Sequence, residues 1–411
     1  MRVAILSEYF YPDNSGGTPT DLSEFGRFLK QHYPAITIEV VTSRNLYRFS
    51  GVQVKLPVHE VWQGVGITRL RTPRSNRPSM ALRMMAGGLF SCVALVHLLF
   101  RKRYDLLLIV TNPPANGMAA WFYRKLRGVP YVYLVHDLYP DIAVALGGIN
   151  RQSAVVRLFS LLQKRWLNAA SRVVVLGRCM QRYLMQHYAV PLARLSVIPS
   201  WADPDAIQVS SCENGFRKEH GLTGFVVLYA GNFSRYVNLD QMIAAARLLP
   251  ADAQVMIVLV GDGARKQEIL DRIKAEGLTN VRVLPKVPRS AMGEVLAAAN
   301  ASMIPLDSRM LGLGVPSKLY STLGAGRPVL ALVPEESEVA RVVAEEECGL
   351  RVPDGDAAAL AKAILRLQQD PVLAKQMGLN ARRALENRFT LRHAAEKFHA
   401  LFEEVVAGHQ K

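Results

Sequence analysis

The sequence predicts an α/β protein built from two doubly wound parallel sheets, and three observations carry that prediction. Short apolar runs alternate with helical periodicity along the whole chain, which is the pattern of βα units on parallel sheets. This series of runs begins twice, at Val3 and again at Val226. The 411 residues, 50% hydrophobic and 20% charged, are enough for two or three domains with substantial cores. These values exclude a disordered or coiled-coil protein.

The predicted strands are apolar enough to be buried on both faces of a sheet. The first series comprises residues 3–6, 36–41, 106–110, 131–135, 172–176 and 195–198. The second comprises residues 226–230, 255–260, 281–284, 301–304, 329–332 and 349–352. Pro199 and Pro204 interrupt the pattern between the two series, so we expect a first domain over 1–200 and a second over 206–385. The chain end is amphipathic, and we expect a helix over 390–411 that packs back on the first domain.

Positive charge is concentrated in the first half of the chain. The formal net charge is +16; residues 1–205 carry 25 basic and 11 acidic side chains, whereas residues 206–411 carry 25 and 23. Such a distribution favours a phosphate-bearing partner, either nucleic acid or an anionic membrane surface. Aromatic residues are not interleaved with the basic ones and no nucleic-acid-binding motif occurs, so we expect no nucleic acid.

The four cysteines lie 33 or more residues apart, which favours neither a disulfide framework nor a Cys-x-x-Cys site and fits a reducing cytoplasm. Glu8 ends the first apolar run too early for a signal-peptide core, so we expect the N-terminus to stay inside the cell.

One apolar segment, Met80 to Phe100, leaves three alternatives open. From Met84 to Phe100 there are 17 residues without formal charge, at the lower limit for a membrane span, and arginines flank both ends. A strand is expected within six residues of its end, which favours a buried crossover helix over an interfacial helix and makes a true span the least favoured.

Glycine-rich loops follow several predicted strands, at the edge where open α/β sheets bind ligands. Gly16-Gly17 precedes the first helix, where backbone N–H groups can approach a phosphate. In the second series the loops are Gly231-Asn232, Gly261-Asp262-Gly263 and Gly312 to Lys318. Neither the dinucleotide motif G-x-G-x-x-G nor a P-loop occurs, which argues against NAD-type and P-loop proteins.

Taken together, these motifs resemble glycosyltransferase family four, the retaining nucleotide-sugar enzymes of the GT-B fold. The resemblance covers nearly the whole chain, and the block from Pro316-Ser317-Lys318 through Ala325-Gly326-Arg327-Pro328 is its most specific part. His136-Asp137 after a strand belongs to the same set. The sequence is most similar to the bacterial branch that builds exopolysaccharide, capsule or O-antigen units.

This resemblance implies two Rossmann-like domains facing a cleft, with an acceptor on the first and a nucleotide-sugar on the second. The implied diphosphate ligands are Gly16, Gly17, Asn232, Arg235, Ser317 and Lys318. The implied nucleotide ligands are Gly231, Gly261, Asp262, Gly263, Pro285, Lys286, Val287 and Ser321. The implied donor-sugar contacts are His136, Gly314, Val315 and Pro316, and the implied catalytic residues are His136, Asp137 and Lys318. The acceptor hydroxyl would be the nucleophile, and neither a cofactor nor a metal is expected.

The branch implies hexose transfer, with UDP-sugars favoured, to a lipid-diphosphate-linked saccharide at the cytoplasmic face of the membrane. The family's two glutamates fall on Leu313 and Ser321, and its arginine and lysine fall on Asn232 and Val237. Two alternatives therefore stay open: a GT-B nucleotide-sugar 2-epimerase and a non-catalytic, membrane-associated nucleotide-sugar-binding subunit. Asp141, four residues after Asp137, is expected either to orient His136, to act on the acceptor or to cap the following helix.

Overall fold

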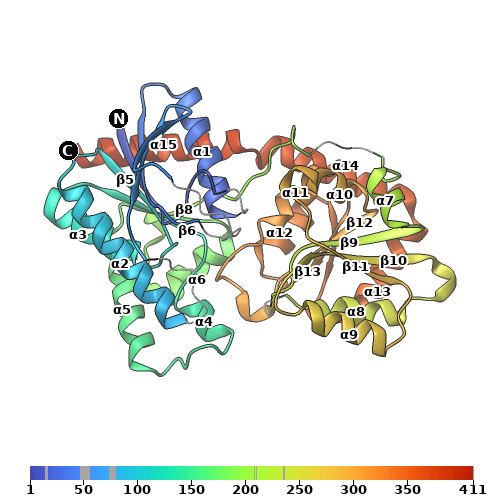
Figure 1. Cartoon of the computed structure of the whole chain (residues 1–411). Helices are drawn as coiled ribbons and strands as arrows, with labels where there is room; N and C mark the ends of the chain where they lie inside the picture. Colours follow the sequence, from blue (N-terminus) through green and yellow to red (C-terminus); the bar gives the residue numbers. More distant parts are fainter. Residues whose placement is uncertain are drawn as a thin grey trace. The chain divides into compact units, whose positions relative to one another are not determined.

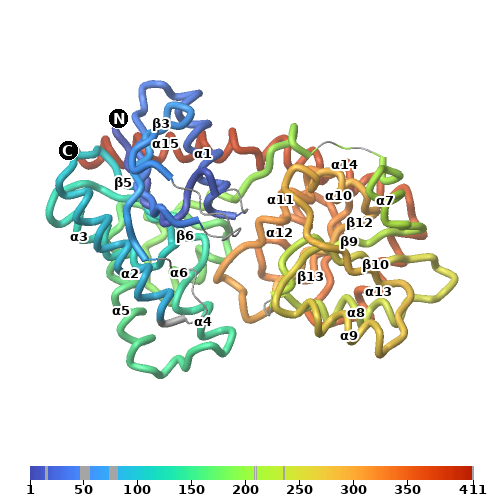
Figure 2. The backbone as a smooth tube through the Cα atoms, viewed as in Figure 1, coloured from blue at the N-terminus to red at the C-terminus, as the bar shows by residue number. Residues whose placement is uncertain are grey.

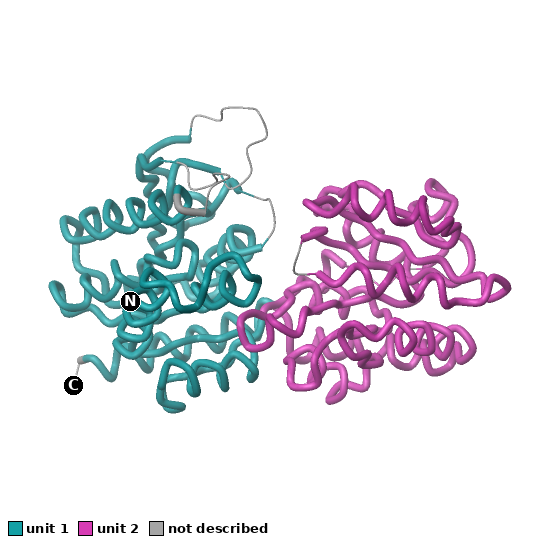
Figure 3. The backbone as a smooth tube through the Cα atoms, turned by 90° about the horizontal axis from the view of Figure 1, so that it is seen from below, with its two compact units in different colours: residues 1–199, 391–411 teal, residues 200–390 magenta. Residues whose placement is uncertain are grey.

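The structure is a computed structural model (Figure 1) that describes residues 1–13, 17–46, 56–73, 80–207, 209, 211–234 and 237–410. The chain forms two compact units, coloured separately in Figure 3. Unit 1 comprises Met1–Pro199 and Leu391–Lys411, and unit 2 comprises Ser200–Thr390. The chain therefore passes from one unit to the other at Pro199 and returns after Thr390.

Unit 1 contains an eight-stranded sheet in the order β3-β4-β2-β1-β5-β6-β7-β8. The strands are β1 (Arg2–Leu6), β2 (Thr37–Ser43), β3 (His59–Trp62), β4 (Val65–Leu70), β5 (Leu106–Val110), β6 (Tyr131–Val135), β7 (Arg172–Val175) and β8 (Leu195–Val197). Every pairing is parallel except that between β3 and β4. All residues of β5 and β6 are buried, as expected for strands covered on both faces.

The hairpin of β3 and β4 was not predicted from the sequence. Gln63 (φ 52°) and Gly64 (φ 80°) form its two-residue turn, and positive φ at both positions gives the twist that hairpin strands favour. Strand β3 has the sequence His-Glu-Val-Trp, in which exposed and half-buried side chains alternate, so it lacks the apolar run that marked the other strands. The Gln-Gly pair between two β-type segments was the signal for it.

Helices cover both faces of the unit 1 sheet. Helix α1 (Thr18–His32) lies on one face, where α15 (Leu391–Gln410) packs along it (Figure 2). Phe25 and Phe398 form part of that contact, with ring centroids 4.8 Å apart. The other face carries α2 (Met80–Leu99), α3 (Asn116–Arg127), α5 (Ala154–Ala169) and α6 (Arg178–Tyr188), and α4 (Asp141–Ala145) follows β6.

Unit 2 contains a six-stranded, fully parallel sheet in the order β11-β10-β9-β12-β13-β14. Its strands are β9 (Phe225–Asn232), β10 (Val255–Asp262), β11 (Val281–Leu284), β12 (Ala301–Pro305), β13 (Val329–Leu332) and β14 (Gly349–Val352). Its helices are α7 (Gly215–His220), α8 (Leu239–Leu248), α9 (Lys266–Ala275), α10 (Met292–Ala297), α11 (Lys318–Gly324), α12 (Glu338–Glu345), α13 (Ala357–Gln369) and α14 (Pro371–Arg388).

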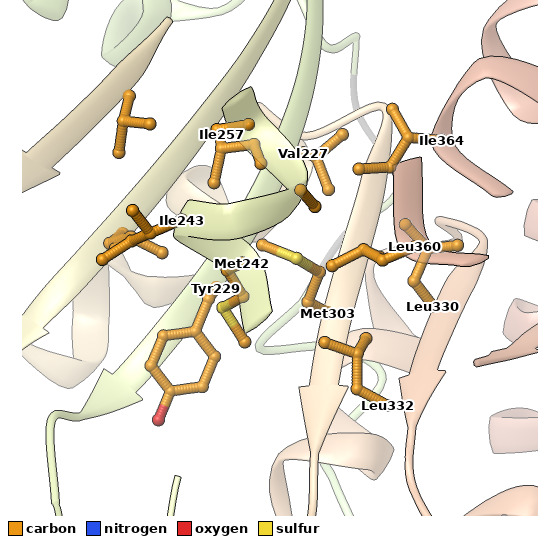
Figure 4. Close-up of a cluster of buried hydrophobic side chains, with 14 of the residues drawn as sticks. Val227, Tyr229, Met242, Ile243, Ile257, Met303, Leu330, Leu332, Leu360 and Ile364 are labelled. Atoms are coloured by element: carbon orange, nitrogen blue, oxygen red, sulfur yellow. The ribbon is translucent and has the colours of Figure 1, made fainter. Parts of the chain in front are cut away.

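Aliphatic side chains from the unit 2 sheet pack against α8 and α13, as the cluster in Figure 4 shows. Val227, Ile257 and Leu330 come from the sheet, and Met242 and Leu360 from the helices; all five are fully buried. The predicted fold class, with two parallel-sheet α/β domains, is therefore confirmed.

Candidate active site

The carboxyl edge of the unit 2 sheet gathers the glycine-rich segments at one place. The chain runs from β9 to β10 and β11 on one side and to β12 on the other, so neighbouring strands β9 and β12 flank the topological switch point. Ligands of open α/β sheets bind outside the carboxyl ends of the strands at such a point. Gly231 lies one residue before the end of β9 on one side of it, and Lys318 begins α11, after β12, on the other.

Lys318 and Gly231 meet at this switch point. A β-carbon built on Gly231 would lie 1.8 Å from Lys318 Nζ, so the ammonium group occupies space that only glycine leaves open. Lys318 Nζ donates a hydrogen bond to the Tyr229 hydroxyl at 3.0 Å and lies 4.7 Å from the centre of that ring. The Tyr229 hydroxyl in turn donates to the Asn232 carbonyl at 2.8 Å. In Figure 4 the Tyr229 ring lies at the edge of the apolar cluster with its hydroxyl pointing away from it.

Among the described residues, no carboxylate forms an ion pair with the Lys318 ammonium. Burial lowers the pKa of Lys318 to about 8, so the group still carries its proton at neutral pH. A half-buried cation that is held by a tyrosine and faces no carboxylate favours an anionic ligand.

A second close approach joins the ends of β9 and β10. Both strands run two residues further than the sequence predicted, because Gly231 pairs with Gly261 and Asn232 with Asp262. A β-carbon on Gly261 would lie 1.8 Å from the Gly231 carbonyl oxygen, and one on Gly263 would lie 2.5 Å from Asn232 Oδ1. The first two residues of each predicted loop are thus strand residues, and their backbones approach as only glycine permits.

The remaining predicted residues of unit 2 lie on the segments that leave the same sheet edge. Pro285, Lys286 and Val287 follow β11, where the first two are exposed and the third is half-buried. The segment between β12 and α11 contains Gly314, Val315, Pro316 and the exposed Ser317, and Ser321 is half-buried within α11. Leu313 and Val237, at two positions where the family has charged residues, pack in apolar surroundings.

His136 follows β6 at the carboxyl edge of the unit 1 sheet. The Thr111 hydroxyl, just beyond β5, accepts hydrogen bonds from the backbone N–H groups of His136 (3.2 Å) and Asp137 (3.3 Å). Burial lowers the pKa of His136 to about 4, so the imidazole is neutral at pH 7. Its Nε2 is buried and forms no hydrogen bond to the residues that the structure describes, which leaves one polar atom available for a ligand.

The two aspartates after His136 differ. Asp137 is exposed. Asp141 accepts hydrogen bonds from the hydroxyl groups of Tyr183 (2.7 Å) and Tyr188, both of α6. The expectation that Asp141 orients His136 or caps the next helix was wrong, since its oxygens hold the tyrosines and Pro140 stands at the cap position of α4.

Two predicted residues, Gly16 and Arg235, lie outside the described residues. Gly17 is exposed and precedes α1, with its carbonyl accepting from the N–H groups of Thr20 and Asp21. Sequence reasoning missed Tyr229 and Thr111, which position Lys318 and the His136 segment. Among the residues with described positions, no cluster of three or more His, Cys, Asp or Glu side chains suits a metal ion.

Comparison with known proteins agrees with the fold, and the two together define a GT-B glycosyltransferase. Residues 34–201 match the glycosyl transferase 4-like domain, and residues 213–384 match the glycosyl transferases group 1 model. Together the two models cover most of the chain, so the chain is a glycosyltransferase of the family-four type. A probable glycosyltransferase of Pseudomonas aeruginosa, WbjE, is 28% identical over 82% of this chain and 84% of its own. The D-rhamnosyltransferase WbpZ of the same species is 24% identical over 72% of this chain and 78% of its own.

Solved structures show the same fold. Sucrose-phosphate synthase of Thermosynechococcus elongatus superposes with a TM-score of 0.79 at 20% identity, over 99% of this chain and 100% of that one. HepE of Anabaena, solved with UDP, gives a TM-score of 0.73 at 16% identity, over 98% of this chain and 100% of HepE. WaaG, a glycosyltransferase involved in lipopolysaccharide biosynthesis, gives a TM-score of 0.71 at 16% identity, over 97% of this chain and 99% of WaaG. The predicted enzyme class is confirmed by these comparisons.

Proposed function

We propose that the protein transfers a hexose with retention of configuration from a nucleotide-sugar, with UDP favoured as the nucleotide, to a lipid-diphosphate-linked saccharide. The single observation that carries the proposal is the half-buried Lys318 ammonium, held at 3.0 Å by Tyr229 at the switch point of unit 2. HepE, of the same fold, has been solved with UDP, with UDP and glucose, and with UDP-glucose, which supports UDP as the donor nucleotide.

Lys318 stabilises the charge that develops on the diphosphate as the bond to the sugar breaks. The ammonium is already fixed by Tyr229 and by the contact with Gly231, so little reorganisation accompanies the reaction. Ser317 and the backbone near Asn232 would add hydrogen bonds to the diphosphate. Gly17 and Arg235 are the other proposed diphosphate ligands. A side-chain cation in this role makes a metal or a cofactor unnecessary, so we propose a metal-independent reaction.

The nucleotide would rest on the neighbouring segments of the same edge. The close backbone pairing of Gly231 with Gly261, followed by Asp262 and Gly263, is proposed to bring the base and its ribose against the ends of β9 and β10. Residues 285–287 would border the base. Ser321 would supply a hydroxyl to the ribose in place of the family's glutamate.

His136 would serve the donor sugar, together with residues 314–316. A neutral imidazole offers one donor and one acceptor, and the free Nε2 suits a sugar hydroxyl. The acceptor hydroxyl would attack on the face from which the diphosphate leaves, and the exposed Asp137 carboxylate is proposed to accept its proton. An epimerase or a non-catalytic subunit would use the nucleotide site without this acceptor step.

A lipid-linked acceptor places the reaction at the cytoplasmic face of the membrane. The relatives support this part of the proposal: WaaG is involved in lipopolysaccharide biosynthesis, and WaaB is a lipopolysaccharide outer core galactosyltransferase. The concentration of basic residues in the first half of the chain suits the diphosphate of such an acceptor.

The test is an assay with UDP-sugars labelled in the hexose, with and without EDTA, in the presence of an undecaprenyl-diphosphate-linked saccharide. Transfer yields labelled lipid, epimerisation yields a new free UDP-sugar, and a non-catalytic subunit yields neither. We expect labelled lipid in both conditions and a loss of about 100- to 1000-fold in kcat for Lys318→Ala. Lys362→Ala, an exposed lysine on α13, is the matched control and should keep wild-type turnover. Wild-type turnover in Lys318→Ala would contradict the proposal.

A further inference from the structure

Helix α2 exposes a continuous apolar stripe. Its members recur every three to seven residues, which places them on one side of the helix over about 27 Å. They are 47% to 87% exposed: Leu82, Met85, Leu89, Val96 and, just beyond the helix end, Phe100. The opposite side of α2 is buried in unit 1 through Ala86, Phe90, Ala94 and Leu98.

The neighbouring helices continue this stripe. Helix α2 packs along α3, and α3 packs along α5, so the three lie side by side on one face of the sheet (Figure 1). Helix α3 exposes Phe122 and Leu126, and α5 exposes Val155, Leu158 and Leu161, the last three each at 60% or more. The exposed apolar side chains of α2, α3 and α5, including Phe100, are called here the apolar face.

The surroundings of the apolar face are basic. The sequences of α2, α3 and α5 contain seven lysine or arginine residues and no aspartate or glutamate. From residue 61 to residue 202 there are nineteen basic and three acidic side chains, so this stretch accounts for the net charge of the whole protein. On α5, Arg157, Lys164 and Arg165 are exposed beside Leu158 and Leu161.

We propose that the apolar face binds the surface of an anionic lipid bilayer. Apolar side chains would enter the boundary between headgroups and acyl chains, and the lysines and arginines would contact lipid phosphates. A second copy of the chain is disfavoured, because a symmetric contact would bring two like-charged faces together.

Helix α2 would lie in the plane of the membrane. By length and composition its segment Leu82–Leu99 could cross a bilayer, but a third of it (33%) is buried inside unit 1. The sequence left three alternatives open: a buried crossover helix, an interfacial helix and, least favoured, a membrane span. The structure shows a crossover helix with one buried and one exposed side.

The apolar face begins at the same sheet edge as His136. A β-carbon on Gly87 would lie 2.7 Å from Pro113, which follows β5 two residues after Thr111, and Thr111 holds the backbone of His136. Bilayer binding itself goes beyond the proposed transfer and does not depend on it. If the transfer also holds, this arrangement presents a lipid-linked acceptor from the membrane to the His136 segment.

The test is co-sedimentation of the full chain with vesicles of phosphatidylglycerol and phosphatidylcholine, and with phosphatidylcholine alone. We expect binding to the anionic vesicles only, weakened by added salt. The triple variant Met85→Gln/Leu89→Gln/Val96→Gln should weaken binding by about tenfold or more. Val372→Gln/Leu379→Gln, at exposed apolar positions of α14, is the control and should bind as wild type does.

A second variant tests the charge. Lys125→Gln/Arg157→Gln/Lys164→Gln/Arg165→Gln should lose about tenfold or more in binding. Lys218→Gln/Arg247→Gln/Lys274→Gln/Lys362→Gln removes the same charge from unit 2 and should lose less. Circular dichroism and UDP binding confirm that each variant is folded.

Three results would overturn the proposal: no binding of the wild type to anionic vesicles, wild-type binding by the triple variant, or a dimer in solution that the triple variant abolishes. A bound partner protein that only the wild type retains in lipid-free solution would also count against it. Lys318→Ala should bind vesicles normally, so a failure of catalysis and a failure of membrane binding are distinguishable.

Discussion

The two units of the molecule use the same parallel-sheet architecture for different purposes. In unit 2 the candidate site is made by close approach at glycines: a side chain on Gly261 would meet the Gly231 carbonyl oxygen, and Lys318 Nζ occupies the space beside Gly231. In unit 1 the candidate site depends on individual side chains, such as Thr111 under His136, and the helices α2, α3 and α5 expose apolar and basic groups. In the proposed function, the glycines of unit 2 therefore serve the nucleotide, and the surface side chains of unit 1 serve the acceptor and the membrane.

The strongest way to break this comparison is a substitution that fills the backbone contact of unit 2. Gly261→Ala would place its β-carbon 1.8 Å from the Gly231 carbonyl oxygen, and backbone atoms cannot move aside cheaply. We expect the free energy of unfolding to fall by about 3 kcal/mol or more, measured by urea denaturation. A loss below about 1 kcal/mol would show that the pairing of β9 and β10 does not need glycine.

The charge of Lys318 can be tested through pH. Its pKa of about 8 predicts that UDP affinity is constant below pH 8 and then falls by up to about tenfold per pH unit. Above its pKa, Lys318 loses its proton in the free protein, whereas it keeps that proton when the diphosphate is bound. Isothermal titration calorimetry measures this dependence. Lys318→Arg should remove it, since a guanidinium stays charged. A fall of the same size in Lys318→Arg would assign the titration to another group.

A smaller effect tests the unit 1 site. Thr111→Val removes the hydroxyl that accepts from the N–H groups of His136 and Asp137, with little change in shape. We expect kcat to fall about tenfold and the free energy of unfolding by about 1–2 kcal/mol, while UDP binding is unchanged. Thr111→Ser keeps the oxygen and should retain most activity. Loss of UDP affinity in Thr111→Val would show that the two units do not divide the work in this way.

The smallest effect sharpens the contrast between glycines. Gly88 lies within α2, and a β-carbon there would meet nothing within 4 Å. Gly88→Ala should therefore raise the free energy of unfolding by about 0.5–1 kcal/mol, the opposite sign to Gly261→Ala. The same denaturation experiment checks it, and a destabilised Gly88→Ala would mean that α2 packs more tightly than the structure shows.

Most of the fold could be predicted from the sequence, because strands buried on both faces must be apolar throughout. All twelve predicted strands occur. The missed strands are β3, which is exposed at the sheet edge, and β4, in which Gly66, Thr68 and Arg69 interrupt the apolar run. The glycines and Lys318 could be recognised from local motifs. Tyr229 and Thr111 could not, because their partners are 89 and 25 residues away in the chain.

Asp141 also shows that sequence spacing does not predict contacts between residues far apart in the chain. Its spacing from His136 suggested a functional pair, but two tyrosines of α6, more than 40 residues later, take up its oxygens. Local spacing identifies glycines at which the backbone approaches a neighbouring strand or side chain. It does not identify contacts that arise only when helices pack.

The central claim is that Lys318 and the glycine pair of unit 2 form a nucleoside-diphosphate site. The most direct measurement is titration calorimetry of wild type and Lys318→Ala with UDP, GDP and ADP in the absence of metal. We predict that one nucleotide, UDP, binds the wild type and that Lys318→Ala binds it at least about tenfold more weakly. If no nucleotide binds, or if Lys318→Ala binds as tightly as the wild type, the claim is contradicted and the non-catalytic alternative becomes the better account.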